Sequence, residues 1–258
     1  MKSLIDKFKR SPLMKVVKEI EYRSPLRSHF FPFWDYMMTP PQLCFLCQCN
    51  ESTRKSEGIL LEVGCAQGAT TVFLNKYMQA QGIEKPYICV DTFSGFISDD
   101  IQYEVSQRGK KKSYYGGFRL NKKSWFEGTM EMNRISRVKA IEADANEFDF
   151  KKLGPISFAL LDVDLYRPIK TCLPKLYEAL SPGGIIVVDD CNAADEYFDG
   201  AHAAYKEFCA GLGRPQQIMF KKLGVLEKGE SEEVKRDGRS PDGRPAEIRI
   251  DSSISFTE

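Results

Sequence analysis

Short apolar runs alternate with longer amphipathic stretches from Gly58 to about residue 226, and this alternation is the strongest constraint on the fold. Five runs have the length and composition of buried strands: GILLEV, YICV, RVKAIEAD, SFALLDV and GGIIVVDD. Helical patterns lie between and after them, at residues 70–81, 172–180 and 197–209. Strands that alternate with helices predict an α/β fold whose mostly parallel sheet carries helices on both faces. A final pair, QIMFKK and GVLEK, predicts a terminal antiparallel hairpin, which brings the sheet to seven strands.

The charge balance gives no reason to expect nucleic acid or an anionic membrane as the main partner. Lys and Arg number 37 against 36 Asp and Glu in 258 residues, so a small-molecule substrate is favoured. No run approaches the roughly 20 apolar residues that a membrane-spanning helix requires, so we expect no membrane insertion. Eight cysteines are scattered through the expected helices and strands, and no hydrophobic stretch follows the basic start MKSLIDKFKR. These features predict reduced thiols and a cytoplasmic protein.

A glycine turn follows the first expected strand, in the segment ILLEVGCAQGATTVFL. Gly64 and Gly68 would let the backbone approach a ligand closely beside a helix N-terminus, and Glu62 precedes them at the strand end. The spacing E-x-G-x-x-x-G departs from the dinucleotide signature G-x-G-x-x-G. Taken alone, the segment also fits an ordinary tight turn from strand to helix.

The next two strands also end on acids. Asp91 ends YICVD, where an acid in a nucleotide-binding α/β fold accepts both ribose hydroxyls, and Asp144 in IEADANEF could accept a hydrogen bond from an adenine amino group. Acids at three strand ends, with Glu62 as the first, suit a ligand with a cationic amino-acid end better than a pyrophosphate. The pattern therefore favours S-adenosylmethionine over NAD as the cofactor.

A second group of acids follows the fourth and fifth strands. Asp162 ends SFALLD, and Asp189 and Asp190 end GGIIVVDD. Because parallel strands open on the same edge, these three carboxylates can converge on Mg²⁺ or a similar cation, which would lower the pKa of a substrate hydroxyl and orient it for methyl transfer. Acids at strand ends also cap helices, and we assign that role to Asp164. His202 could act as a base near the metal, but a packing or surface role is favoured.

Three segments resemble the macrocin O-methyltransferase family: LLEVGCAQGATT, VDTFSGF and LDVDLYRPIKTCLPKLYEALSPGGIIVVDDC. The resemblance spans about residues 36–226, and the succession DVDLY, SPGG, VDD is its most specific part. It implies a Rossmann-like class I methyltransferase fold, S-adenosylmethionine, Mg²⁺ and a hydroxyl acceptor on a sugar or a glycosylated natural product. It also makes Asp162, Asp189 and Asp190 the metal ligands, with Asp162 as the general base.

The chain divides by composition into three parts. Residues 1–50 form an aromatic and proline-rich helical cap, residues 51–228 the methyltransferase domain, and residues 229–258 a charged tail. Within the domain, residues 96–127 are too polar and irregular for a core, and we expect them to form a lid. The aromatic stretch at residues 30–38 is compatible with a homo-oligomer.

Two rival enzyme functions differ from the leading one in acceptor or in cofactor. A catechol-type enzyme would use the same cofactor and metal on an aromatic diol, since vicinal hydroxyls chelate a metal on either kind of ring. An NAD-dependent oxidoreductase is disfavoured by the missing glycine pattern. A non-catalytic binding protein would normally lack one of the three metal-site acids, and all three are present.

Overall fold

The computed structural model describes residues 12–24 and 37–229. The charged C-terminal tail and most of the aromatic stretch before residue 38 lie outside these residues, as do the predictions made for them. By its internal contacts the chain divides into two units, Met1–Thr39 and Pro40–Glu258.

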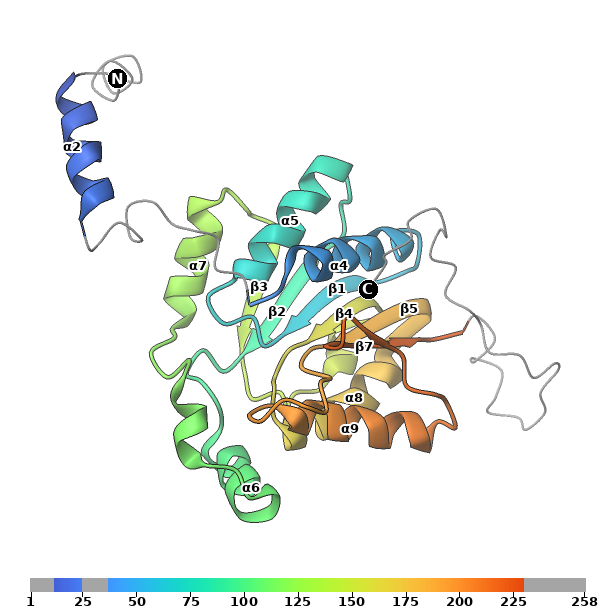
Figure 1. Ribbon diagram of the computed structural model, residues 1–258. Helices are drawn as coiled ribbons and strands as arrows, with labels where there is room; N and C mark the ends of the chain where they lie inside the picture. Colours follow the sequence, from blue (N-terminus) through green and yellow to red (C-terminus); the bar gives the residue numbers. More distant parts are fainter. Residues whose placement is uncertain (1–11, 25–36, 230–258) are drawn as a thin grey trace. The chain divides into compact units, whose positions relative to one another are not determined.

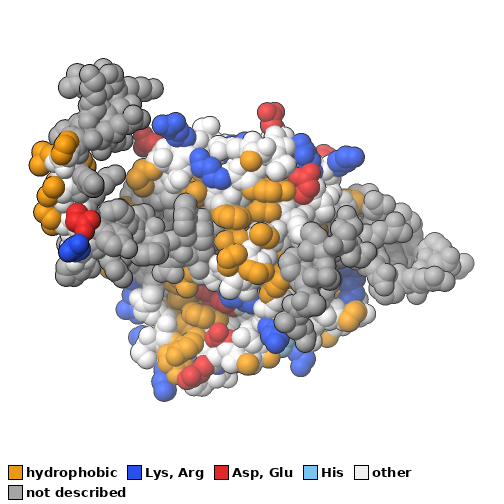
Figure 2. Space-filling model, turned by 45° about the horizontal axis from the view of Figure 1, so that its top comes forward, with side chains coloured by type: hydrophobic (Ala, Val, Ile, Leu, Met, Phe, Trp, Pro, Cys, Tyr) orange, Lys and Arg blue, Asp and Glu red, His pale blue; other side chains and the backbone are white. Residues whose placement is uncertain are grey.

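The first unit contains one described helix, α2 (Pro12–Arg23). Leu13, Val16 and Ile20 follow one another at helical spacing along it, and each is more than half exposed. Figure 2 shows hydrophobic side chains on this helix. On the face of the molecule that Figure 2 shows, basic and acidic side chains are interspersed over the described residues. Helix α2 is thus amphipathic, with an exposed apolar face.

The second unit is built on a seven-stranded sheet with the strand order β3-β2-β1-β4-β5-β7-β6. Strands β1 to β5 pair in parallel, whereas β7 pairs antiparallel with both β5 and β6. The predicted mostly parallel sheet with a terminal antiparallel hairpin is therefore confirmed. Its strands are β1 (Ile59–Val63), β2 (Tyr87–Asp91), β3 (Val138–Glu142), β4 (Ile156–Leu161), β5 (Leu180–Val188), β6 (Ile218–Met219) and β7 (Leu223–Glu227).

Helices cover both faces of the sheet, as the alternation predicts. Figure 1 shows α4 and α5 on one face and α8 and α9 on the other. Every residue of the central strand β4 is buried, because a parallel strand between two helical layers has no face in water. Ile169, Leu173 and Leu176 of α8 pack into this core. These helices are α4 (Pro40–Ser52), α5 (Ala69–Gln81), α8 (Tyr166–Ala179) and α9 (Asp199–Gly211).

The insert between β2 and β3 is more regular than the sequence suggests. It contains α6 (Ser98–Arg108), the short 3-10 helix η1 (Lys112–Gly116) and α7 (Lys123–Met132). The expectation of an irregular segment at 96–127 is wrong in this respect, because the segment forms helices whose polar residues are partly exposed, whereas Asp100 and Glu104 of α6 are buried. Another 3-10 helix, η2 (Phe150–Leu153), precedes β4. Across the described residues, no helix combines the length and hydrophobicity that crossing a membrane demands.

The ends of β1 and β4 approach each other closely at Gly64. The amide of Asp162 donates to the carbonyl of Val63 at 2.8 Å, which continues the β1–β4 pairing past both strands. Gly64 has a φ of +88°, and a Cβ at this position would overlap the carbonyl oxygen of Asp162. Glycine is therefore required here both by the backbone conformation and by the space available.

We expect Gly64→Ala to destabilise the fold more than Gly82→Ala. Both glycines have positive φ, but a Cβ at Gly82 would meet nothing within 4 Å. Gly82→Ala should therefore cost roughly 1–2 kcal/mol of backbone strain. Gly64→Ala should cost roughly 1–3 kcal/mol more, because the Asp162 backbone must move. Urea unfolding of both variants measures the difference, and equal losses would contradict the close approach.

Candidate functional site

The loop from β1 to α5 is shaped by the protein's own packing at both of its glycines. Gly64 lies against Asp162, and Gly68, with a φ of +87°, lies so close to Phe126 and Met130 of α7 that a Cβ would overlap both side chains. The loop is compact, since the amide of Gly68 donates to the carbonyl of Cys65 at 2.8 Å. It leads directly into α5, whose N-terminus faces the carboxyl edge of the sheet.

Glu62 lies beneath this loop, in a buried position. Its side chain is almost fully buried, and its Oε2 accepts hydrogen bonds from the hydroxyls of Thr71 and Tyr87, both at 2.7 Å. Burial raises its pKa from 4.5 to about 7, against the lowering effect of these two hydrogen bonds. In this conformation the carboxylate joins β1, β2 and α5 beneath the loop.

Asp91 supports the same loop from the end of β2. Its Oδ2 accepts from the amide of Ala66 at 2.8 Å, and its Oδ1 accepts from the amide of Phe93 at 2.6 Å. Burial raises the pKa of Asp91, whereas these backbone hydrogen bonds act to lower it. Hydrogen bonds from the backbone and the side chain of Cys65 also act to lower the pKa of Asp91, so the loop itself engages this carboxylate.

Asp144 lies two residues beyond the end of β3. Its Oδ1 accepts from the amide of Asn146 at 2.8 Å, and the side chain of Asn146 donates to Asp100 of α6 at 2.9 Å. Asp91 and Asp144 therefore follow neighbouring parallel strands at one edge of the sheet, since Asp91 pairs with Glu142.

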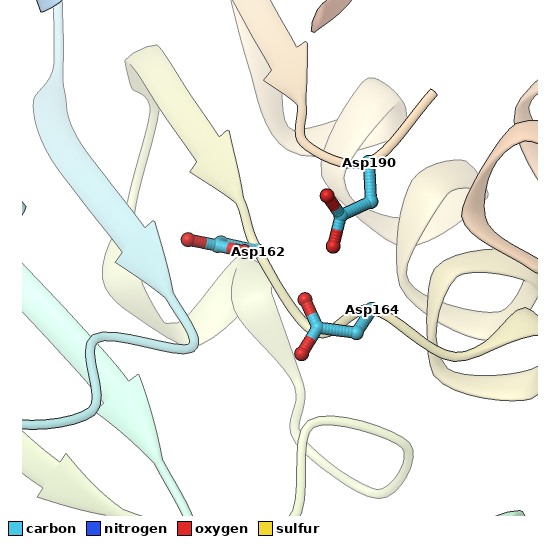
Figure 3. A group of neighbouring side chains, drawn as sticks. All are labelled: Asp162, Asp164 and Asp190. Atoms are coloured by element: carbon cyan, nitrogen blue, oxygen red, sulfur yellow. The ribbon is translucent and has the colours of Figure 1, made fainter. Parts of the chain in front are cut away.

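Three carboxylates meet at the ends of β4 and β5. One oxygen from each of Asp162, Asp164 and Asp190 lies within 4.8 Å of the other two. Figure 3 shows that Asp162 and Asp164 come from the segment after β4, and Asp190 from the turn after β5. Among the described residues this is a group with the ligand spacing of a metal site, and it contains two of the three predicted ligands.

The third member of this cluster is Asp164, not Asp189. The role of helix cap assigned to Asp164 is wrong, because α8 has Leu165 as its N-cap and no capping side chain there. Instead, Glu104 of α6 accepts a hydrogen bond from the Tyr166 amide at 2.8 Å. Asp164 and Asp190 both have positive φ, at 60° and 56°, which is uncommon outside glycine and is found at functional sites.

Burial and mutual repulsion make the acid cluster electrostatically costly. Burial raises the pKa of Asp162 well above its ordinary value, and the charges of the neighbouring aspartates raise it further. The pKa of Asp164 is raised in the same way, first by burial and then by Asp190. A bound cation would relieve this repulsion.

Asp189 faces a lysine of the terminal hairpin. The Nζ of Lys222 lies 2.7 Å from Oδ2 of Asp189 and 3.1 Å from Oδ1 of Asp190. Burial raises the pKa of Asp189, the charge of Asp190 raises it further, and Lys222 acts to lower it. Sequence reasoning missed Lys222, although β7 runs antiparallel to β5 and so begins beside the acids that follow β5.

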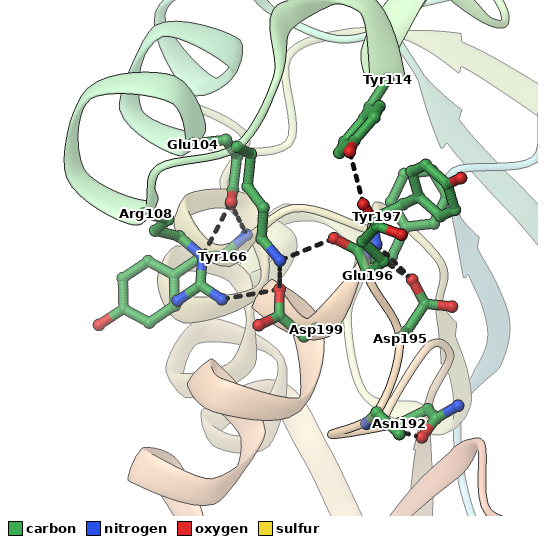
Figure 4. A network of polar contacts seen from close by, with 12 residues as sticks. Glu104, Arg108, Tyr114, Tyr166, Asn192, Asp195, Glu196, Tyr197 and Asp199 are labelled. Carbon is green, nitrogen blue, oxygen red and sulfur yellow. Dashed lines mark hydrogen bonds and ion pairs between the residues drawn. The ribbon is translucent and has the colours of Figure 1, made fainter.

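The insert is fastened to the segment that follows the acid cluster (Figure 4). Asp199, the first residue of α9, forms ion pairs with Arg108 at 3.0 Å and Lys110 at 2.7 Å. Arg108 also pairs with Glu104 at 2.8 Å, and Lys110 donates to the carbonyl of Glu196 at 2.7 Å. The predicted lid region therefore has ordered attachments near the end of β5.

His202 is turned toward the start of the terminal hairpin. Its Nε2 lies 2.9 Å from the side-chain oxygen of Gln216, a partner that agrees with the expected packing or surface role.

Comparison with known proteins decides the family. The Macrocin-O-methyltransferase (TylF) family matches residues 31–212, which is well over half of the chain. The chain belongs to this family. The resemblance inferred from DVDLY, SPGG and VDD is thereby confirmed, and the protein is an O-methyltransferase. No curated protein matches the chain.

Solved structures share the fold of this macrocin O-methyltransferase family member. The O-methyltransferase NovP is 16% identical with a TM-score of 0.62, and the match covers 75% of this chain and 82% of NovP. The calicheamicin methyltransferase CalS11 is 16% identical with a TM-score of 0.60, over 84% of this chain and 93% of CalS11. A putative caffeoyl-CoA O-methyltransferase from Staphylococcus aureus is 13% identical with a TM-score of 0.53, over 88% of this chain and 98% of that one. These likenesses confirm the class I methyltransferase fold.

We expect the buried Glu62 to make stability fall with rising pH. The pKa of Glu62 is about 7 in the folded state and near 4.5 in the unfolded state. The contribution of its protonated form to the unfolding free energy is therefore complete below pH 4.5 and is lost as the pH approaches 7. The unfolding free energy of the wild type should fall by roughly 2–3 kcal/mol relative to Glu62→Gln between pH 5 and 7. Urea unfolding at several pH values measures this difference.

Glu84→Gln is the matched control, because Glu84 is exposed on the surface. Its unfolding free energy should keep a constant offset from the wild type over the same pH range. Parallel curves for the wild type and Glu62→Gln would show that Glu62 is not held protonated by burial.

Proposed function

We propose that the protein transfers a methyl group from S-adenosylmethionine to a hydroxyl of a sugar or glycosylated natural product, with help from Mg²⁺ or a similar divalent cation. The observation that carries this proposal is the group of three carboxylates within 4.8 Å, beside the glycine loop of a macrocin O-methyltransferase family member. Gly64 contacts the backbone of Asp162, so the two proposed binding regions adjoin each other.

The cofactor would lie along the carboxyl edge of β1, β2 and β3. In this proposal the backbone of Gly64 to Gly68 lines the amino-acid end, and the Asp91 carboxylate at the end of β2 receives the ribose hydroxyls. Asp144 accepts from the adenine amino group. Glu62 acts from beneath, by holding the first turn of α5 through Thr71 rather than by direct contact.

The acid cluster has the chemistry and the spacing of a divalent cation site. Oxygen ligands of one cation lie at most twice the metal–oxygen distance apart, which is about 4.2 Å for Mg²⁺ and about 5 Å for Ca²⁺. The oxygens of Asp162, Asp164 and Asp190 fall within 4.8 Å of one another, so small side-chain movements suffice. All three are hard oxygen donors, and their repulsion favours a cation between them.

Asp162 is the residue that we propose as general base. When bound, the cation lowers the pKa of the acceptor hydroxyl and the sulfonium of the cofactor offers an electrophilic methyl group. Asp162 has two carboxylate oxygens, so one can hold the cation while the other accepts the hydroxyl proton. Its backbone contact with Gly64 fixes this base beside the cofactor loop.

We expect Asp162→Asn to reduce turnover by roughly 10²–10⁴-fold, because the amide can neither accept the proton nor balance the cation. Affinity for S-adenosylhomocysteine should stay within about tenfold, or 1.4 kcal/mol, since the glycine loop and Asp91 are unchanged. Asp99→Asn is the matched control, because Asp99 is exposed on α6. Mass spectrometry of methylated product measures turnover, and near-normal turnover in Asp162→Asn would contradict the assignment.

The same assay distinguishes the two acceptor classes. Glycosides and catechols tested in parallel, each with and without Mg²⁺, should give methylated product from the glycosides. Product from the catechols alone would support the aromatic diol as acceptor and contradict the sugar.

A further inference from the structure

Lys222 is a partly buried cation beside the acid cluster, and the proposed reaction does not use it. Its Nζ contacts Asp189 at 2.7 Å and Asp190 at 3.1 Å, and its side chain is 24% exposed. Asp189 is 3% exposed, and its Oδ1 has no hydrogen-bond partner among the described residues. With so little water around it, Asp189 depends on Lys222 for charge compensation.

The sheet register brings Lys222 to this position. Strands β5 and β7 pair antiparallel, with Val188 opposite Gly224. The same register, continued by two residues, sets Lys222 opposite Asp190. The amide of Cys191 donates to the carbonyl of Lys222 at 2.6 Å, so the backbone of Lys222 is also fastened to the turn that carries the acids.

The β6–β7 turn, which directly precedes β7 and includes Lys222, has a strained backbone conformation. Phe220 and Lys221 have φ values of +53° and +55°, and the amide of Lys222 donates to the carbonyl of Met219 at 3.1 Å. Turns with positive φ at both central residues strongly prefer Asn and Gly. Phe220 stabilises the turn by packing edge-on against Phe45 of α4, with ring centroids 5.9 Å apart.

We propose that Lys222 is a built-in counter-cation that competes with the divalent cation for Asp189 and Asp190. This inference rests on the cation site proposed above, and Lys222 acts in it as a positioning residue. Because Asp190 contacts Lys222 as well, binding of the divalent cation weakens that contact, and the lysine lowers the affinity of the site.

The test compares Lys222→Met with Lys221→Met in the full chain. Lys221 is the neighbouring residue of the same turn, is exposed, and loses the same charge on substitution. Calorimetric titration of the protein with Mn²⁺, and separately with Mg²⁺, measures the dissociation constant without any acceptor. Lys222→Met should bind about tenfold or more tightly than the wild type, because a positive charge leaves the site. Lys221→Met should stay near the wild type.

Asp189→Asn is a second variant, for which we expect the opposite change in affinity for the divalent cation. This variant retains Lys222 but replaces the carboxylate of Asp189, with which Lys222 makes its shorter ion pair. The ammonium should then pair with Asp190, and binding of the divalent cation should weaken. If the role of Lys222 were purely structural, both Lys222→Met and Asp189→Asn would bind the divalent cation more weakly than the wild type. Where Lys222→Met does not fold without a metal, Lys222→Gln, which keeps a polar side chain beside Asp189, takes its place, with the same expectation of tighter cation binding.

The outcomes separate this inference from the proposed function. A wild type that binds the cations, with Lys222→Met no tighter, overturns the role of Lys222 and leaves the cation site standing. Binding by Lys222→Met but not by the wild type supports the counter-cation and contradicts a metal-dependent wild-type enzyme. Absence of binding in both proteins overturns both proposals.

Discussion

Four aspartates gather at the ends of β4 and β5, and the balance of their negative charge is the constraint on which the rest of the site depends. Asp162, Asp164 and Asp190 bring oxygens within 4.8 Å of one another, and Asp189 adjoins them. Like charges at this spacing repel strongly in a partly buried position. Lys222 compensates part of that charge, which leaves the remainder to attract a divalent cation.

The sheet explains why this charge lies beside the cofactor loop. In the strand order β3-β2-β1-β4-β5, chain connections run in opposite directions from β1 and β4, and ligands of open α/β sheets bind at such a switch point. Gly64 follows β1 at this point, and its contact with the backbone of Asp162 links the loop to the acid cluster. One junction of two strands therefore positions the methyl donor, the base and the cation ligands of the proposed reaction.

The sequence predicted the fold well because hydrophobic periodicity reports directly on burial. The alternation of strands and helices, the parallel sheet and the terminal hairpin all appear in the structure. The same reasoning located the acids after β4 and β5, because strand ends share one edge. It also expected irregularity at residues 96–127, where polar composition concealed the helices α6 and α7.

Side-chain direction was harder to predict than side-chain location. Asp164 enters the cluster through a left-handed backbone conformation, which is not evident from the spacing D-V-D. Asp189 turns to Lys222, a residue 33 positions later whose place depends on strand register. Glu62 lies at a strand end as expected, but its carboxylate is directed into the sheet–helix interface, toward Thr71 and Tyr87. In each case a tertiary contact decided the orientation.

Calorimetric titration with S-adenosylhomocysteine, with and without Mg²⁺ and with NADH as the control, tests the central claim most directly. The claim is that the junction of β1 and β4 binds a methyl donor beside a divalent cation. The account predicts binding of S-adenosylhomocysteine, a further heat of binding for Mg²⁺, and none for NADH. Binding of NADH in place of S-adenosylhomocysteine would contradict it.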